Sequence, residues 1–137
     1  MKILGVDFGD SRTGFAISDA LGFGASVLDA FKCNNINKVA EYTAKLAKQL
    51  SAEKIVLGYP KNMNGTCGPR AEKTQLFSEL LSNLCDIPII LWDERLTTVS
   101  AHNLMNETNV RGKKRKESVD SVSAAYLLQS YLDSLNL

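Results

Sequence analysis

The sequence is poor in the residues that build zinc sites and disulfide frameworks. His102 is the single histidine, and the three cysteines, Cys33, Cys67 and Cys85, lie far apart with no Cys-x-x-Cys pair. This pattern argues against a structural zinc site or a disulfide scaffold and favours reduced thiols. No apolar run approaches the roughly 20 residues that span a bilayer, and Asp7 interrupts the apolar start that a secretion signal would need. We therefore expect a cytoplasmic protein without membrane association.

The chain also lacks a large excess of charge of either sign. Lysine and arginine together number 16, aspartate and glutamate 15, and the formal net charge is +1. Five of the basic residues, however, lie within six positions: Arg111, Lys113, Lys114, Arg115 and Lys116. The rest of the chain carries 11 basic against 15 acidic residues, a balance of −4. A mildly acidic body with one concentrated basic segment is therefore expected.

Length and hydrophobic patterning predict a single α/β domain over residues 1–137. The expected strands cover residues 2–8, 13–19, 25–31, 54–58 and 87–92. The expected helices cover residues 36–50, about 70–84, 98–106 and about 118–135. Short turns between the first three strands predict an antiparallel meander. Residues 107–116 are polar and lack apolar periodicity, which predicts a mobile loop.

Two of the expected strands end in carboxylates. Asp7 ends the first strand two residues before Gly9, and Asp93 and Glu94 directly follow the last strand. In an open α/β sheet, ligands gather beyond the carboxyl ends of parallel strands, so these side chains could meet a metal or a phosphate. The alternatives are structural, because Asp and Gly are common in turns and acidic residues stabilise helix N-termini.

Asp120 lies in the last expected helix, on the same stripe as Ala124, Leu127, Leu128 and Tyr131. That stripe should face the sheet, where a carboxylate is costly to desolvate unless a cation or a metal pairs with it. The alternative is an aspartate that stabilises the first turn of its helix. One hypothesis joins all the acidic positions: they converge on Mg²⁺ or Mn²⁺, which prefer oxygen ligands and support phosphodiester hydrolysis.

Four blocks of the sequence match a known family. They are Asp7-x-Gly9-x-x-Arg12-x-Gly14, the run from Gly58 to Thr66, Asp93-Glu94-Arg95-Leu96-Thr97-Thr98 with Ala101, and Asp120-Ser121-x-x-Ala124-Ala125-x-x-Leu128-Gln129-x-Tyr131-Leu132. In order and spacing they resemble the YqgF-type family of Holliday-junction-resolvase-like pre-16S rRNA nucleases, over nearly the whole chain. Tyr59, Lys61 and Asn64 depart from the residues usual in the second block of that family.

The resemblance implies an RNase H-like fold, with a five-stranded mixed sheet that begins with three antiparallel strands and is flanked by helices. It implies a metal-dependent nuclease that hydrolyses phosphodiester bonds in structured nucleic acid and processes the 5′ end of the 16S rRNA precursor. Branched DNA, as for a Holliday-junction resolvase, is the alternative substrate. The acidic triad carried over from the family is Asp7, Glu94 and Asp120, binding Mg²⁺ or Mn²⁺, with Asp93 as the alternative to Glu94.

Further polar residues are candidates for substrate binding. Arg12 and Arg95 lie within five residues of proposed catalytic carboxylates and could hold a phosphate through two hydrogen bonds. Asn62 and Asn64 belong to a loop, residues 58–68, that is expected to line the same cleft. The basic segment defined above precedes the helix that bears Asp120, so we expect it to contact the substrate backbone beside the cleft.

Two other classes of function stay open. The protein could bind nucleic acid without cleaving it, because the presence of the acids does not prove turnover. It could also be related to actin-like ATPases or sugar kinases, which use an Asp-x-Gly turn beside phosphates. Those proteins bind the nucleotide between two such domains, and 137 residues supply one. We expect a monomer or a weak homodimer.

Overall fold

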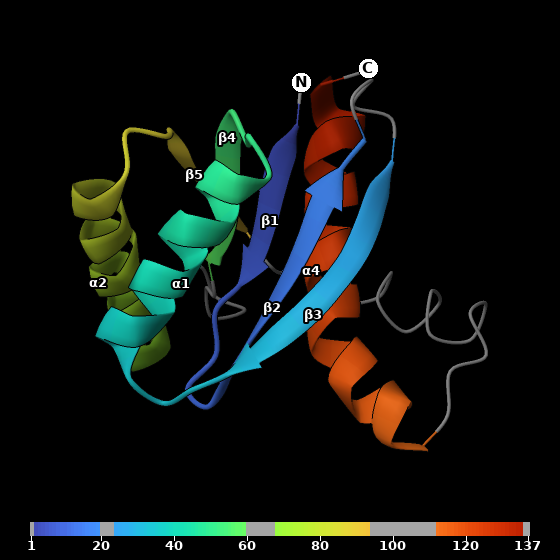
Figure 1. Cartoon of the computed structure of the whole chain (residues 1–137), viewed down its shortest axis with the longest axis horizontal. Coiled ribbons are helices and arrows are strands. Elements are labelled where there is room, and N and C mark those ends of the chain that lie inside the picture. Colours follow the sequence, from blue (N-terminus) through green and yellow to red (C-terminus); the bar gives the residue numbers. More distant parts are fainter. Residues whose placement is uncertain (1, 20–23, 60–67, 94–111, 136–137) are drawn as a thin grey trace.

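A computed structural model describes residues 2–19, 24–59, 68–93 and 112–135, and of residues 112–121 it describes the backbone alone. The strands are β1 (Ile3–Asp7), β2 (Arg12–Ser18), β3 (Ala25–Lys32), β4 (Lys54–Tyr59) and β5 (Ile89–Asp93). The helices are α1 (Ile36–Gln49), α2 (Pro69–Leu84) and α4 (Gly112–Leu135). Helices α1 and α2 cover one face of a five-stranded sheet and α4 covers the other (Figure 1).

The sheet has the strand order β3-β2-β1-β4-β5. Strands β1, β2 and β3 pair antiparallel, which confirms the predicted meander, whereas β4 pairs parallel with both β1 and β5. Strand β5 begins at Ile89, two residues later than predicted. Pro88 has no backbone N–H to donate to the ladder, although its carbonyl accepts a hydrogen bond from Ile55 N at 2.9 Å.

Helix α4 begins at Gly112, six residues before the predicted start of the last helix. Lys113, Lys114, Arg115 and Lys116 are therefore helical, and the prediction of a loop through these positions was wrong. Lysine, arginine and glutamate are good helix formers, but a helical turn that carries no apolar stripe cannot be told from a loop by periodicity. The helix predicted over residues 98–106 and the residues 107–111 lie outside the described residues.

The side chains of β1 alternate between two apolar layers. Leu4 and Val6 are buried in the layer formed with α1 and α2, whereas Ile3 is buried in the layer formed with α4. No helix within the described ranges is both long enough and apolar enough to cross a membrane.

Gly5 is a point of close approach between α4 and the sheet. A Cβ atom at this position would lie 2.9 Å from Cβ of Leu128 and 3.0 Å from the carbonyl oxygen of Ala124. The stripe predicted from the sequence, which includes Ala124, Leu127, Leu128 and Tyr131, is buried. The absence of a side chain at position 5 therefore lets the backbone of α4 rest directly on β1.

Two hydrogen bonds fix α4 across the width of the sheet. Trp92 Nε1 on β5 donates to Ser130 Oγ at 3.2 Å, and the Trp92 ring meets the Tyr131 ring edge-on, with centroids 5.3 Å apart. On the other side, Ala25 N at the start of β3 donates to Gln129 Oε1 at 3.2 Å. These contacts hold the helix in one position relative to the strand ends.

Gly5→Ala should lower the free energy of unfolding by about 1–3 kcal/mol, because the added methyl group must push α4 away from β1. Urea unfolding followed by circular dichroism measures the change. Gly24→Ala is the matched control, since its added Cβ would lie 3.7 Å from the nearest atom, Asp19 Oδ2. We expect no loss of stability there, and an equal loss at both positions would contradict the account.

Candidate active site at the carboxyl edge of the sheet

The parallel strands β1, β4 and β5 end at the same edge of the sheet. Val6 pairs with Leu57, and Gly58 pairs with Trp92, so Asp7 lies level with Gly58 and Trp92. One residue further along, Tyr59 pairs with Asp93. Asp7 and Asp93 are both half-buried. This edge therefore carries two of the carboxylates singled out in the sequence.

The two carboxylates, however, lie on opposite faces of the sheet. Asp7 follows Ile3 and Gly5 at two-residue spacing, which puts it on the α4 face. Trp92 contacts α4, so the alternation of the strand puts Asp93 on the face of α2. Tyr59, the register partner of Asp93, lies on the α2 face as well, since its hydroxyl accepts a hydrogen bond from Gln75 Nε2 of α2 at 2.9 Å.

Asp120 lies on α4, one helical turn before Ala124. Its side chain lies outside the described part of the structure, as does the whole of Glu94. Among the side chains that are described, no three of His, Cys, Asp or Glu come together in a group that could hold a metal ion. The structure thus brings the backbone of α4 to the face that carries Asp7.

The turn between β1 and β2 explains why the first sequence block has glycine at position 9. A Cβ atom at Gly9 would collide with the carbonyl oxygen of Arg12, so glycine is required by the turn itself. The turn is also held by a hydrogen bond of 3.1 Å from Cys33 N to the carbonyl oxygen of Ser11. Arg12 is half-buried at the start of β2, at the same edge of the sheet as Asp7.

Helix α2 is anchored to the residues that follow Asp7. The ring of Phe8 stacks on the ring of Phe77, with centroids 4.5 Å apart and an interplanar angle of 14°. One turn earlier on the helix, Lys73 Nζ donates a hydrogen bond of 2.8 Å to Asp10 Oδ1. The hydrogen bond and positive charge of Lys73, and to a lesser degree the charge of Arg70, lower the pKa of Asp10 below its ordinary value.

Sequence reasoning missed these contacts. Lys73 and Asp10 are 63 positions apart, and neither residue carries a local signal for the other. The spacing of Lys73 and Phe77 indicates a shared helix face, but the partner of that face depends on how the helix returns to the sheet.

The other predicted substrate-binding residues are described only in part. Asn62, Asn64, Arg95 and Arg111 lie outside the described residues. Lys113, Lys114, Arg115 and Lys116 lie in the first turns of α4, where the backbone is described. Figure 1 shows these turns extending past the end of β1, at the end of the molecule that bears Asp7.

This chain has the same fold as solved structures to which its sequence identity is low. Thermus thermophilus RuvC in complex with a Holliday junction substrate superposes with a TM-score of 0.64 at 10% identity, covering 98% of this chain and 96% of that one. A fowlpox virus resolvase in complex with Holliday junction DNA superposes with a TM-score of 0.56 at 15% identity, covering 98% and 99%. At these identities the likeness shows the fold, which is the RNase H-like fold expected from the sequence.

Close relatives cover nearly the whole chain. A protein of Ruminiclostridium cellulolyticum named "Putative pre-16S rRNA nuclease" is 48% identical over 136 residues, 98% of this chain and 96% of its own length. A Bacillus subtilis protein of the same name is 43% identical over 140 residues, 99% of this chain and 100% of its own length. The RuvX family, described as Holliday junction resolvase, matches residues 1–134. This agreement confirms the resemblance seen in the four sequence blocks, and the chain belongs to the RuvX family.

Proposed function

We propose that this chain acts as a single-domain, divalent-metal-dependent nuclease over residues 1–137, with Asp7, Glu94 and Asp120 as its catalytic carboxylates. The proposal depends above all on one observation, the close approach of α4 to β1 at Gly5. That contact holds the helix bearing Asp120 against the strand that ends in Asp7. Membership of a nuclease family supports hydrolysis of nucleic-acid ester bonds.

The register between α4 and β1 supports the pairing of Asp120 with Asp7. Figure 1 shows the start of β1 and the end of α4 at the same end of the molecule, so the two elements run antiparallel. Asp7 lies two residues beyond Gly5, about 6.6 Å along the strand. Asp120 lies four residues before Ala124, about 6 Å along the helix in the same direction. The two acidic positions are therefore nearly level.

The third carboxylate is Glu94 in this proposal. Asp93 lies on the α2 face together with Tyr59, away from the face of Asp7. The face that Asp93 occupies is not the one on which we propose the metal site. We therefore favour Glu94 over Asp93, which the sequence alone left as alternatives.

The donor set fits Mg²⁺ or Mn²⁺, because all three proposed ligands are carboxylates and hard cations prefer oxygen donors. When bound, such an ion would activate water and stabilise the leaving oxygen of the phosphodiester. Carboxylates that share one site repel each other, and a bound cation relieves this repulsion. Arg12, at the same edge, offers a guanidinium that can hold a phosphate through two hydrogen bonds.

The names of the relatives support the 16S rRNA precursor as the substrate. We place the cleavage at its 5′ end, as the sequence resemblance implies, and such a protein would act in the cytoplasm. The remaining substrate contacts that we propose are phosphate or sugar contacts by Asn62, Asn64, Arg95 and Arg111 and by the basic residues 113–116. The first turns of α4 extend past the end of β1, beside the proposed catalytic edge, which supports a role in backbone binding (Figure 1). Branched DNA is the second candidate substrate, supported by the description of the family.

The purified protein should cleave an RNA spanning the 5′ leader of the 16S rRNA precursor with Mg²⁺ or Mn²⁺ and not with EDTA. Asp7→Asn should reduce the rate by more than the roughly 10- to 100-fold that follows loss of a group supporting a metal ligand. Binding of the RNA should persist in this variant, measured by fluorescence anisotropy. Faster cleavage of a four-way DNA junction would instead assign branched DNA as the substrate. If the protein cleaves neither substrate, the proposal is refuted.

Glu94→Gln and Asp93→Asn form a matched pair, since each removes one negative charge from neighbouring positions. We expect Glu94→Gln to lose activity as severely as Asp7→Asn, and Asp93→Asn to keep most of it, because Asp93 lies on the α2 face. Single-turnover cleavage rates at saturating Mg²⁺ provide the comparison. A larger loss in Asp93→Asn would assign Asp93, not Glu94, to the triad.

A further inference from the structure

The start of α2 carries two cations at the sheet edge that bears Asp7. Arg70 and Lys73 are both exposed and lie three residues apart, which puts them on neighbouring positions of one helix face. Helix α2 covers the opposite side of the sheet from α4 (Figure 1). These two side chains are not part of the site built from Asp7, Glu94 and Asp120.

Two contacts fix this part of α2 relative to Asp7. Phe8, the residue after Asp7, stacks on Phe77, with ring centroids 4.5 Å apart. Asp10 accepts a hydrogen bond of 2.8 Å from Lys73, which precedes Phe77 by one helical turn. Lys73 and Arg70 are thus held four and seven residues along the helix from the aromatic contact with Phe8.

We infer that Arg70 and Lys73 form a phosphate-binding site for the nucleic-acid backbone. In the free protein the Asp10 carboxylate binds Lys73, and a substrate phosphate takes the place of this carboxylate when the substrate binds. This inference rests on the proposed nuclease function.

The exposure of the ion pair makes this exchange feasible. The side chains of Lys73 and Asp10 are 46% and 75% exposed, so water and salt weaken their attraction and the pair contributes little to folding. A phosphate offers the same kind of anionic oxygen acceptor as a carboxylate. The lowered pKa of Asp10 is consistent with an anion favoured at this position by both Lys73 and Arg70.

The location completes a path for the substrate across the edge of the sheet. On the α4 face the basic residues 113–116 lie in the helix that leads to Asp120. On the α2 face Arg70 and Lys73 lie beside the turn that follows Asp7. A backbone that crosses the edge at Asp7 would have cations on both sides, and such contacts position a substrate without reading its sequence.

The test measures binding of a fluorescein-labelled 5′ leader of the 16S rRNA precursor in EDTA, so that cleavage does not contribute. The double variant Arg70→Gln and Lys73→Gln should flatten the dependence of log affinity on log salt by about 1.4–1.8, for two phosphate contacts. Asp10→Asn should tighten binding of the RNA at low salt, because Lys73 no longer pairs with a carboxylate at position 10. All these side chains are exposed, and circular dichroism checks that the variants fold.

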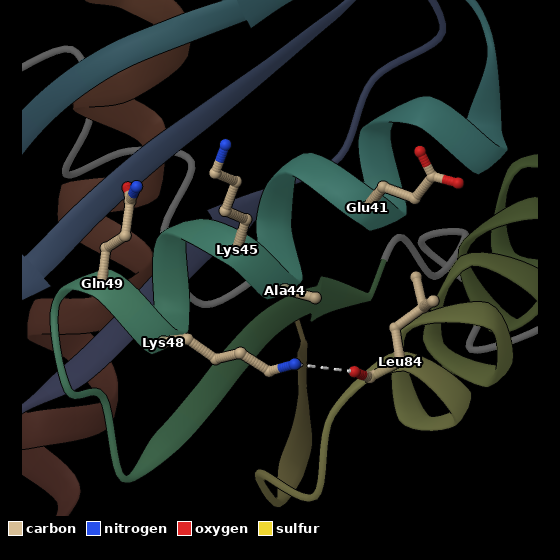
Figure 2. A pocket seen from close by; sticks show the side chains of 6 residues that line it. All are labelled: Glu41, Ala44, Lys45, Lys48, Gln49 and Leu84. Atoms are coloured by element: carbon tan, nitrogen blue, oxygen red, sulfur yellow. Dashed lines mark hydrogen bonds between the residues drawn. The ribbon is translucent and has the colours of Figure 1, made fainter.

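Matched controls come from α1, which begins near the turn after β1 and runs toward the amino end of β1 (Figure 1). A groove of about 320 Å³ is lined by Glu41, Lys45, Lys48 and Leu84. Figure 2 shows these side chains. The end of α1 leads to Glu53, whose N–H donates to the carbonyl of Lys2, so this groove lies toward the amino end of β1. Lys45→Gln with Lys48→Gln should leave the salt slope unchanged, and Glu41→Gln should leave the affinity unchanged.

Two results would overturn the inference while leaving the proposed function intact: an unchanged salt slope in the α2 double variant, or an Asp10→Asn affinity no higher than that of Glu41→Gln. Absence of salt-dependent RNA binding by the wild-type protein would overturn the inference and the proposed function together.

Discussion

Helix α4 rests directly on β1 because residue 5 has no side chain, and the positions of the other functional elements depend on this contact. A methyl group there would meet Leu128 and the backbone of Ala124 at about 3 Å. In our proposal, once Gly5 and Ala124 are apposed, the regular rise of strand and helix brings Asp7 and Asp120 nearly to the same level. The Trp92–Ser130 and Ala25–Gln129 hydrogen bonds then prevent the helix from sliding or rotating on the sheet.

Because side chains alternate along the parallel strands, the residues at the sheet edge are distributed over its two faces. The α4 face carries Asp7 and, in our proposal, the metal ligands. The α2 face carries the aromatic stack of Phe8 on Phe77 and the ion pair of Asp10 with Lys73. Asp7 and Phe8 are adjacent in sequence but lie on different faces of the sheet, because consecutive side chains point to opposite faces.

Much of this arrangement could be predicted from the sequence. The β-branched and aliphatic runs located all five strands within two residues, and the stripe of Ala124, Leu127, Leu128 and Tyr131 identified the buried side of α4. The start of α4 could not be predicted, because lysines 113, 114 and 116 form a helical turn without an apolar side, which periodicity does not detect. The face that Asp93 occupies also required the structure, since its register with Tyr59 and the contact of Trp92 with α4 depend on tertiary packing. The Asp10–Lys73 pair depends on tertiary docking and has no local signature.

We propose that the packing of α4 on β1 creates one divalent-cation site from Asp7 and Asp120. The most direct measurement is anomalous diffraction from crystals of the protein grown with Mn²⁺. The account predicts an anomalous peak bridging oxygens of Asp7 and Asp120, each at about 2.1 Å, the distance usual for a small hard cation. A peak bound elsewhere, or carboxylates of Asp7 and Asp120 too far apart to share a cation, would contradict it.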